Sequence, residues 1–240
     1  MRIIFLFVVF FSQFALANFW VSAELGPVWQ SRNDVGIPAI GGTRFSLKEV
    51  GSGPFLGTRF YAGYHFNKRH SLRLLIAPFS VSAEGTYANN IDFDGVTFIG
   101  GTLLTATYQF NSYRLTFDYH FYRSSDWQLA LGFTAKIRDA KIGLQQGAQL
   151  RENKNVGFVP LLHFSAAYTP RGDWSLLFDI DGLAAPQGRA FDATLQARYQ
   201  LSDSLEVYAG YRTLEGGAEN DTVFTFAWLH YLLAGVKASF

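Results

Sequence analysis

Apolar and polar side chains alternate with a period of two through most of residues 112–138. The apolar positions on one face are Tyr113, Leu115, Phe117, Tyr119, Phe121, Leu129, Leu131, Phe133, Ala135 and Ile137. Ser124-Ser125-Asp126 interrupts the alternation and supplies a turn, so the pattern predicts a β-hairpin of two long strands. Soluble sandwiches rarely need strands of this length, whereas a membrane-spanning strand needs about 9 to 11 residues with its apolar face toward lipid. The intervening polar residues would then line a closed lumen.

The same alternation recurs along the chain and predicts ten strands. Their expected ranges are 19–29, 56–66, a run from 71, 103–122, 128–138, 157–168, 174–183, 191–201, 205–213 and 223–240. Pro78 cannot donate to a ladder, so we expect a bulge or a bend there. An even number suits a single-chain barrel with both termini on one side. We therefore predict an all-β fold, a transmembrane antiparallel up-and-down β-barrel of ten strands, with eight or twelve as alternatives.

The predicted connections alternate between short and long. Short turns are expected at 67–69, 124–126, 170–173 and 202–204, and long loops at 31–54, 84–101, 145–155 and 214–222. The connection at 185–190 is a short exception on the long-loop side. This asymmetry is typical of outer-membrane barrels, which have short periplasmic turns and longer extracellular loops.

The first residues have the features of a secretory signal. Arg2 provides a positive charge, residues 3–11 form a short apolar run, and Ala15-Leu16-Ala17 fits a cleavage site. The apolar run breaks at Ser12-Gln13, well short of the ~20 residues that a membrane-spanning helix needs. We expect a cleaved signal peptide at 1–17, a barrel at 18–240 and a final location in the outer membrane of a Gram-negative envelope.

Composition supports this class and excludes others. Aromatic residues make up 17% of the chain and charged residues 16%, against about 25% charged residues in ordinary soluble domains. The near balance of 20 basic and 19 acidic residues argues against a nucleic-acid partner, which would need a basic face. The absence of cysteine excludes disulfides and thiolate metal sites. The sequence predicts no cofactor and no metal site.

The end of the chain carries a family resemblance. The last residues, HYLLAGVKASF, place Leu232, Ala234, Val236, Ala238 and Phe240 on one face. A terminal Phe after alternating apolar residues resembles the assembly signal of bacterial outer-membrane β-barrels, and the chain looks like the small OmpA-like and OmpW-like barrels. The resemblance implies that Phe240 serves assembly, and that the partners are the barrel-assembly machinery, outer-membrane lipid and lipopolysaccharide. His230 departs from the pattern on the lipid face, so we expect a bulge or an aromatic girdle there.

Many charged residues are predicted to face the lumen. They are Glu24, Arg59, Arg73, Arg114, Asp118, His120, Lys136, Arg138, His163, Asp179, Asp181, Asp192, Arg198, Glu206, Arg212 and Lys237. Buried charges must be paired or hydrated. One interpretation is a salt-bridged plug and another is a water-filled pore. Glu24 and Lys237 are expected to meet where the first and last strands close the barrel.

Three classes of function follow from these features. The first is a structural or surface-interaction barrel with a narrow charged lumen, and the second is a porin-like channel for a small solute. The third is an outer-membrane lipid-modifying enzyme, for which His163, Ser165 and Asp181 could supply a base, a nucleophile and an orienting carboxylate. We expect no enzyme, because these side chains point away from the lipid. Asp92-Phe93-Asp94-Gly95 resembles a fragment of a calcium loop but lacks the closing Glu.

Overall fold

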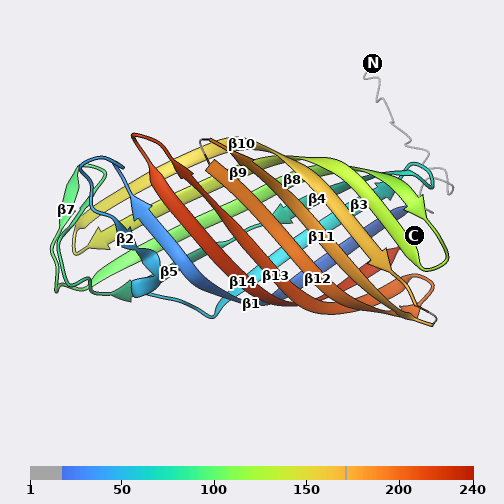
Figure 1. Cartoon of the computed structure of the whole chain (residues 1–240). Coiled ribbons are helices and arrows are strands. Elements are labelled where there is room, and N and C mark those ends of the chain that lie inside the picture. The colour runs from blue at the N-terminus through green and yellow to red at the C-terminus, as the bar shows by residue number, and fades with distance from the viewer. Residues whose placement is uncertain (1–17, 171, 187) are drawn as a thin grey trace, which may run out of the picture.

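The computed structural model describes residues 18–170, 172–186 and 188–240, which form a closed antiparallel barrel (Figure 1). Each main strand pairs with its neighbours in the sequence, and the last strand pairs with the first. The strands are β1 (Phe19–Gly36), β2 (Phe45–Ser46), β3 (Phe55–His65), β4 (His70–Ala77), β5 (Ser80–Gly85), β6 (Ile91–Phe93), β7 (Val96–Phe98), β8 (Leu104–Arg123), β9 (Trp127–Gln146), β10 (Gln149–Tyr168), β11 (Trp174–Ala185), β12 (Gly188–Ser202), β13 (Leu205–Glu219) and β14 (Phe224–Ser239). The predicted signal peptide lies outside the described residues.

The wall has ten strand positions, as predicted, because β4 and β5 both pair with β8 and together make one position. The interruption between them falls at Pro78-Phe79, where the bend was expected. Asn111 compensates for the broken ladder, because its Oδ1 accepts the Phe79 N–H at 3.0 Å. One proline therefore redirects the strand without opening the wall.

Some loops predicted from the sequence are strands. Residues 145–155 were expected to form a polar loop, but β9 and β10 continue through them to a tight turn at Gly147, whose φ is 59°. β1 and β13 likewise extend beyond their predicted ends. The reason is physical: outward positions beyond the apolar belt face water, so the period-two hydrophobic signal disappears although the hydrogen-bonded ladder continues.

The two faces of the wall follow the predicted register. Leu195 is 55% exposed on the outside, whereas its neighbour Thr194 is 3% exposed inside. Outward apolar side chains, including Phe60, Leu74, Leu115, Phe133, Leu162, Leu176, Leu195, Leu232 and Val236, form a belt around the barrel. No helix in the described part of the chain is long and apolar enough to cross a membrane.

The barrel has two different ends. The C-terminus and the short turns lie at the right in Figure 1 and define the turn end, whereas β2 and β7 lie at the left, at the loop end, together with β6, which pairs with β7. Residues 37–54 and 86–103, here called the cap, include β2, the short 3-10 helix Leu47–Glu49 and the β6–β7 hairpin. Cap side chains pack with strand side chains into one buried apolar cluster: Val28, Val35, Ile37, Phe45, Leu47, Phe79, Tyr87, Ile91, Phe93, Phe98, Leu104, Ala106, Tyr108, Ile142, Leu144, Leu214, Ala227, Leu229 and Tyr231.

Candidate functional site: the charged lumen and the cavity beside the cap

Asp192 on β12 is the first centre of a charged network inside the barrel. Its carboxylate accepts hydrogen bonds from Arg59 Nη2 at 2.9 Å and Arg114 Nη2 at 2.6 Å. Arg212 Nη1 donates a third, at 2.8 Å. These four side chains are at most 5% exposed. Three guanidinium groups from β3, β8 and β13 thus converge on one carboxylate from β12.

Glu24 joins this centre and corrects one prediction. Its Oε1 lies 3.0 Å from Arg212 Nη2 and 3.4 Å from Arg59 Nε. The expected partner, Lys237, stands opposite Ser22 in the ladder, and its Nζ lies 5.1 Å from the centre of the Trp20 ring. The Glu24–Lys237 pairing was therefore wrong, because the ladder places Lys237 two positions nearer the turn end than Glu24.

His163 on β10 is the second centre. Its Nδ1 lies 2.8 Å from Asp181 Oδ1, and its Nε2 lies 3.3 Å from Asp118 Oδ1 and 3.6 Å from Asp179 Oδ2. Arg73 also binds one of these three carboxylates, since its Nη1 lies 2.7 Å from Asp179 Oδ2. The sequence predicted that His163 and Asp181 lie at similar depth on neighbouring strands, and the structure confirms it.

Arg114 connects the two centres. Its Nη1 donates to Asp181 Oδ2 at 2.7 Å, while its Nη2 holds Asp192. Thr134 adds a second support, because its hydroxyl donates to Asp181 Oδ1 at 2.7 Å. The two centres thus form one network, which spans the interior of the barrel from Glu24 to Arg73. Charges buried in this way are tolerated because each is matched by opposite charges and hydrogen bonds.

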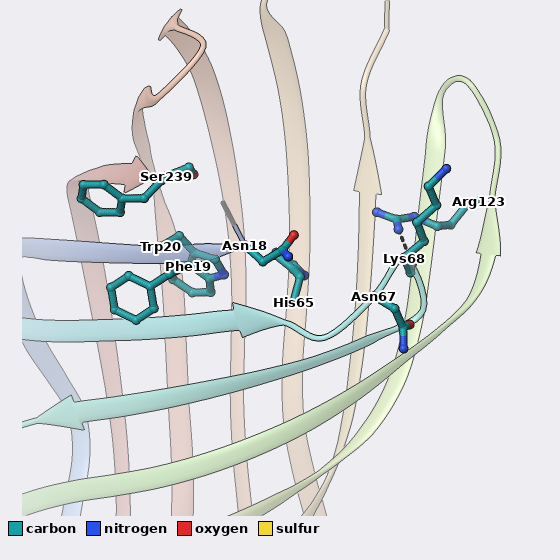
Figure 2. A pocket seen from close by; sticks show the side chains of 9 residues that line it. Asn18, Phe19, Trp20, His65, Asn67, Lys68, Arg123 and Ser239 are labelled. Atoms are coloured by element: carbon teal, nitrogen blue, oxygen red, sulfur yellow. Dashed lines mark hydrogen bonds between the residues drawn. The ribbon is translucent and has the colours of Figure 1, made fainter. Parts of the chain in front are cut away.

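The remaining predicted lumen residues lie outside this network. At the turn end, Arg198 pairs with Glu206 at 3.2 Å, and His120 Nε2 lies 3.3 Å from the Ser71 hydroxyl. A pocket of about 250 Å³ opens at the same end (Figure 2), lined by Asn18, Phe19, Trp20, His65, Asn67, Lys68, Arg123, Ser239 and Phe240. Phe240, the predicted assembly signal, donates its backbone N–H to Phe19 O at 2.8 Å.

The predicted group of His163, Ser165 and Asp181 is only partly assembled. Both ring nitrogens of His163 face carboxylates, and no hydrogen bond joins Ser165 to His163 in the described barrel. The His163 side chain is also 1% exposed. The arrangement therefore suits an ion-pair centre better than a nucleophile activated by a base.

The calcium-loop fragment forms the tight turn between β6 and β7. Asp94 adopts a left-handed φ of 49°, and its carboxylate is held by Arg151 Nε at 2.8 Å. Asp92 accepts the Thr97 hydroxyl at 2.6 Å. Across the described residues, no group of three or more His, Cys, Asp or Glu side chains is placed to hold a metal ion.

The sequence did not predict a cavity of about 450 Å³ beside the cap at the loop end. Lys136 and Arg138 on β9 line it, although the sequence placed them in the charge network. Lys136 Nζ lies 4.7 Å from the Phe110 ring centre, and Arg138 donates to Asn155. The signal in the sequence was the difference between the long 145–155 connection and the short 185–190 connection, because strands of unequal height leave an uneven rim.

Comparison with known proteins places the fold. No protein-family model and no curated protein matches the chain. The solved outer-membrane protease OmpT from Escherichia coli aligns with a TM-score of 0.55 and 11% identity, covering 94% of this chain and 97% of that one. Ail, the attachment invasion locus protein of Yersinia pestis, aligns with a TM-score of 0.38 and 12% identity over 92% and 99% of the two chains. The chain has the fold of the bacterial outer-membrane β-barrels.

Proposed function

We propose that this protein is an integral outer-membrane barrel with a closed, non-conducting lumen and a structural or surface-interaction role. The observation that carries the proposal is the network of Glu24, Asp192 and Asp181 with their arginine partners, which spans the interior. A wide aqueous pore would leave such charges hydrated, whereas these side chains are almost fully buried. Their burial supports a rigid plug.

The cap supports the same proposal at the loop end. Phe93 and Phe98 from the β6–β7 hairpin are essentially unexposed and pack among side chains that point inward from the wall. Gln146 fastens the cap to the β9–β10 hairpin, because its side chain exchanges two hydrogen bonds of 2.9 Å with the Ile99 backbone. An ion would have to cross an apolar layer as well as the charged network. The surface of the cap and the β9–β10 hairpin is then the place for an interaction outside the cell.

Conductance tests the proposal against the small-solute channel. The purified barrel is reconstituted into a planar lipid bilayer, with a general porin treated in the same way as the positive control. We expect no stepwise ionic conductance. Ohmic steps that scale with the amount of inserted barrel would overturn the plug and favour the channel.

We also propose that the protein is not an enzyme. The enclosed position of His163, with carboxylates at both nitrogens, supports this proposal. The test is hydrolysis of ester-linked acyl chains from lipopolysaccharide and phospholipid by the reconstituted barrel. Turnover that His163→Gln abolishes would contradict it, whereas we expect no turnover by either protein.

A further inference from the structure

The cavity beside the cap has mostly apolar walls. Its inner side includes Tyr108, Phe110, Ile142 and Ala227, and the wall opposite is formed by small residues of β11, β12 and β13 such as Ala185 and Gly216. A volume of about 450 Å³ lies within the usual range of ~300 to 1,000 Å³ for small-molecule sites. The space therefore suits one flexible apolar chain.

Two cations project into this apolar space without an acidic partner in the described structure. Lys136 is 3% exposed and its ammonium has no hydrogen-bond or ion-pair partner among the described residues. The Arg138 Nε is also buried without a hydrogen-bond partner. The other basic residues that line the cavity do have acidic partners: Lys141 pairs with Glu152 at 2.9 Å, and Arg189 pairs with Glu215, which also lines the cavity, at 2.6 Å.

The missing counterion is the key observation. A buried ammonium group in an apolar wall is costly unless an anion accompanies it. The nearby carboxylate of the network, Asp192, does not fill this need, because three network arginines already bind it. An anion brought by a ligand would satisfy Lys136 and Arg138 together.

The wall beside the cavity has a seam between β10 and β11. The two strands pair from Tyr168↔Leu176 up to Leu162↔Gly182, and no pairing continues above that point in the described residues. The Thr169 N–H donates to Asp126 O, on the β9 side of β10. Backbone N–H and C=O groups alternate sides along a strand, so the odd-numbered residues of β10 direct these groups toward β9. The backbone groups of the even-numbered residues therefore point toward β11. Pro160 is even-numbered and has no N–H to donate, and β11 ends three residues above Gly182.

The seam faces the apolar exterior. The cavity lining includes Val159, which points inward, and also Phe158 and Pro160, which point outward. Phe158 is 64% exposed and Val156 is 69% exposed, so the outside of β10 at this height is apolar. In an outer membrane this height would meet the acyl chains of the outer leaflet, since apolar outward positions mark the hydrocarbon region.

We propose that this cavity binds a single acyl chain with an anionic headgroup, which Lys136 and Arg138 hold and which reaches the cavity through the β10–β11 seam. The ligand class follows from one mostly apolar space joined to two cations without an acidic partner in the described structure. The source can be a free fatty acid or a single-chain phospholipid of the membrane, because both share this chemistry. The proposal rests on the proposed membrane location but not on the closed lumen, so conductance and binding can fail separately.

The first test is a titration of the detergent-solubilised barrel with dodecanoate, followed by calorimetry in an uncharged detergent. Dodecanol and dodecyltrimethylammonium are the matched ligands without the negative charge. We expect dodecanoate to bind at least about tenfold more tightly than either. Equal binding of all three, or no binding of dodecanoate, would overturn the proposal.

Variants separate the two cations from general surface charge. Lys136→Met and Arg138→Gln should each weaken dodecanoate binding about tenfold or more, and Lys136→Arg should restore most of it. Lys154→Met is the control, because Lys154 is exposed and pairs with Glu152 outside the cavity. Heat-modifiable migration on gels checks that each variant is folded. Unchanged affinity in folded Lys136→Met and Arg138→Gln would assign the binding to the detergent belt instead.

The seam has its own test, which uses the absence of cysteine from the chain. Continuing the register places Val159 opposite Ala185, both inward, so Val159→Cys with Ala185→Cys allows the seam to be closed by oxidation or by a short bifunctional maleimide. The two single variants blocked with a small maleimide are the controls. We expect closure to slow dodecanoate uptake at least tenfold, and an unchanged rate would exclude the seam as the route.

The source of the ligand is identified by analysing what co-purifies with the protein. Native mass spectrometry of the barrel purified from membranes, followed by extraction, should identify either a free fatty acid or a single-chain phospholipid, and Lys136→Met should lose it. Recovery of neither, together with no affinity for dodecanoate or for a lysophosphatidic acid, would contradict the proposed ligand class.

Discussion

The two levels of the lumen are filled in opposite ways. In the middle, Asp192 and Asp181 are surrounded by guanidinium groups and His163, and every carboxylate of the network contacts a basic side chain. Beside the cap, Lys136 and Arg138 lie against apolar walls with no carboxylate partner in the described structure. A matched network stabilises a fixed interior, whereas an unmatched cation keeps a place for an anion from outside. The charge balance therefore separates the middle level, whose role is structural, from the level beside the cap, for which we propose ligand binding.

The largest effect should come from removing a charge at the centre of the network. Asp192→Asn keeps the shape of the side chain but leaves Arg59, Arg114 and Arg212 with an unmatched charge, so we expect a loss of ~3 to 5 kcal/mol in the free energy of unfolding. Glu219→Gln is the matched control, because its pair with Arg44 is exposed, and it should cost less than about 1 kcal/mol. Refolding titrations in lipid vesicles measure both, and equal small losses would mean that water fills the middle of the lumen.

The apolar level should respond to lost volume instead of lost charge. Phe93→Ala removes an unexposed ring from the cap cluster, and we expect a loss of about 3 kcal/mol. The loss should appear as faster amide exchange across the cap, because that region can open locally while the wall stays closed. Ile99→Ala, at an exposed cap position, is the control and should change exchange little. A uniform change in exchange over the whole barrel would contradict a separate apolar level.

The outer face offers a third comparison. Leu195→Arg places a charge in the apolar belt and should cost ~2 kcal/mol or more. Thr194→Arg would be tolerated in a hydrated lumen, but Thr194 is buried and stands opposite Arg212 in the ladder, so we expect it to cost at least as much as Leu195→Arg. Folding titrations compare the two variants. A harmless Thr194→Arg would show that the lumen is wider and wetter than its contacts indicate.

The smallest effect concerns a pair that does not form. A double-mutant cycle on Glu24→Gln and Lys237→Met should give a coupling energy below ~0.5 kcal/mol, since the two side chains have different partners. The same cycle on Glu24→Gln and Arg212→Met is the positive control and should give a clear coupling. A large Glu24–Lys237 coupling would mean that β14 is shifted relative to β1.

The sequence predicted the barrel well because the period-two pattern reports burial on two faces directly. Leu195 and Thr194 illustrate this, since the pattern placed each on the correct side. It failed at 145–155, where both faces of the hairpin are polar and the hydrophobic signal is lost. It placed Lys136 on the inner face, where the structure has it, but alternation says nothing of the height of a side chain or of its neighbours there. Partners that come from distant strands, such as Arg212 for Glu24, are invisible to a local pattern.

The position of Glu24 has a consequence for the order in which the protein is made. Glu24 and Arg59 emerge early in synthesis, whereas Asp192 and Arg212 emerge near the end. A truncated or unfinished chain must therefore keep these early charges in water, since Asp192 and Arg212, which contact them more closely than they contact each other, do not yet exist. Contacts between residues so far apart along a chain form late. Dehydration of the lumen is thus favourable only for a chain that has all of its strands.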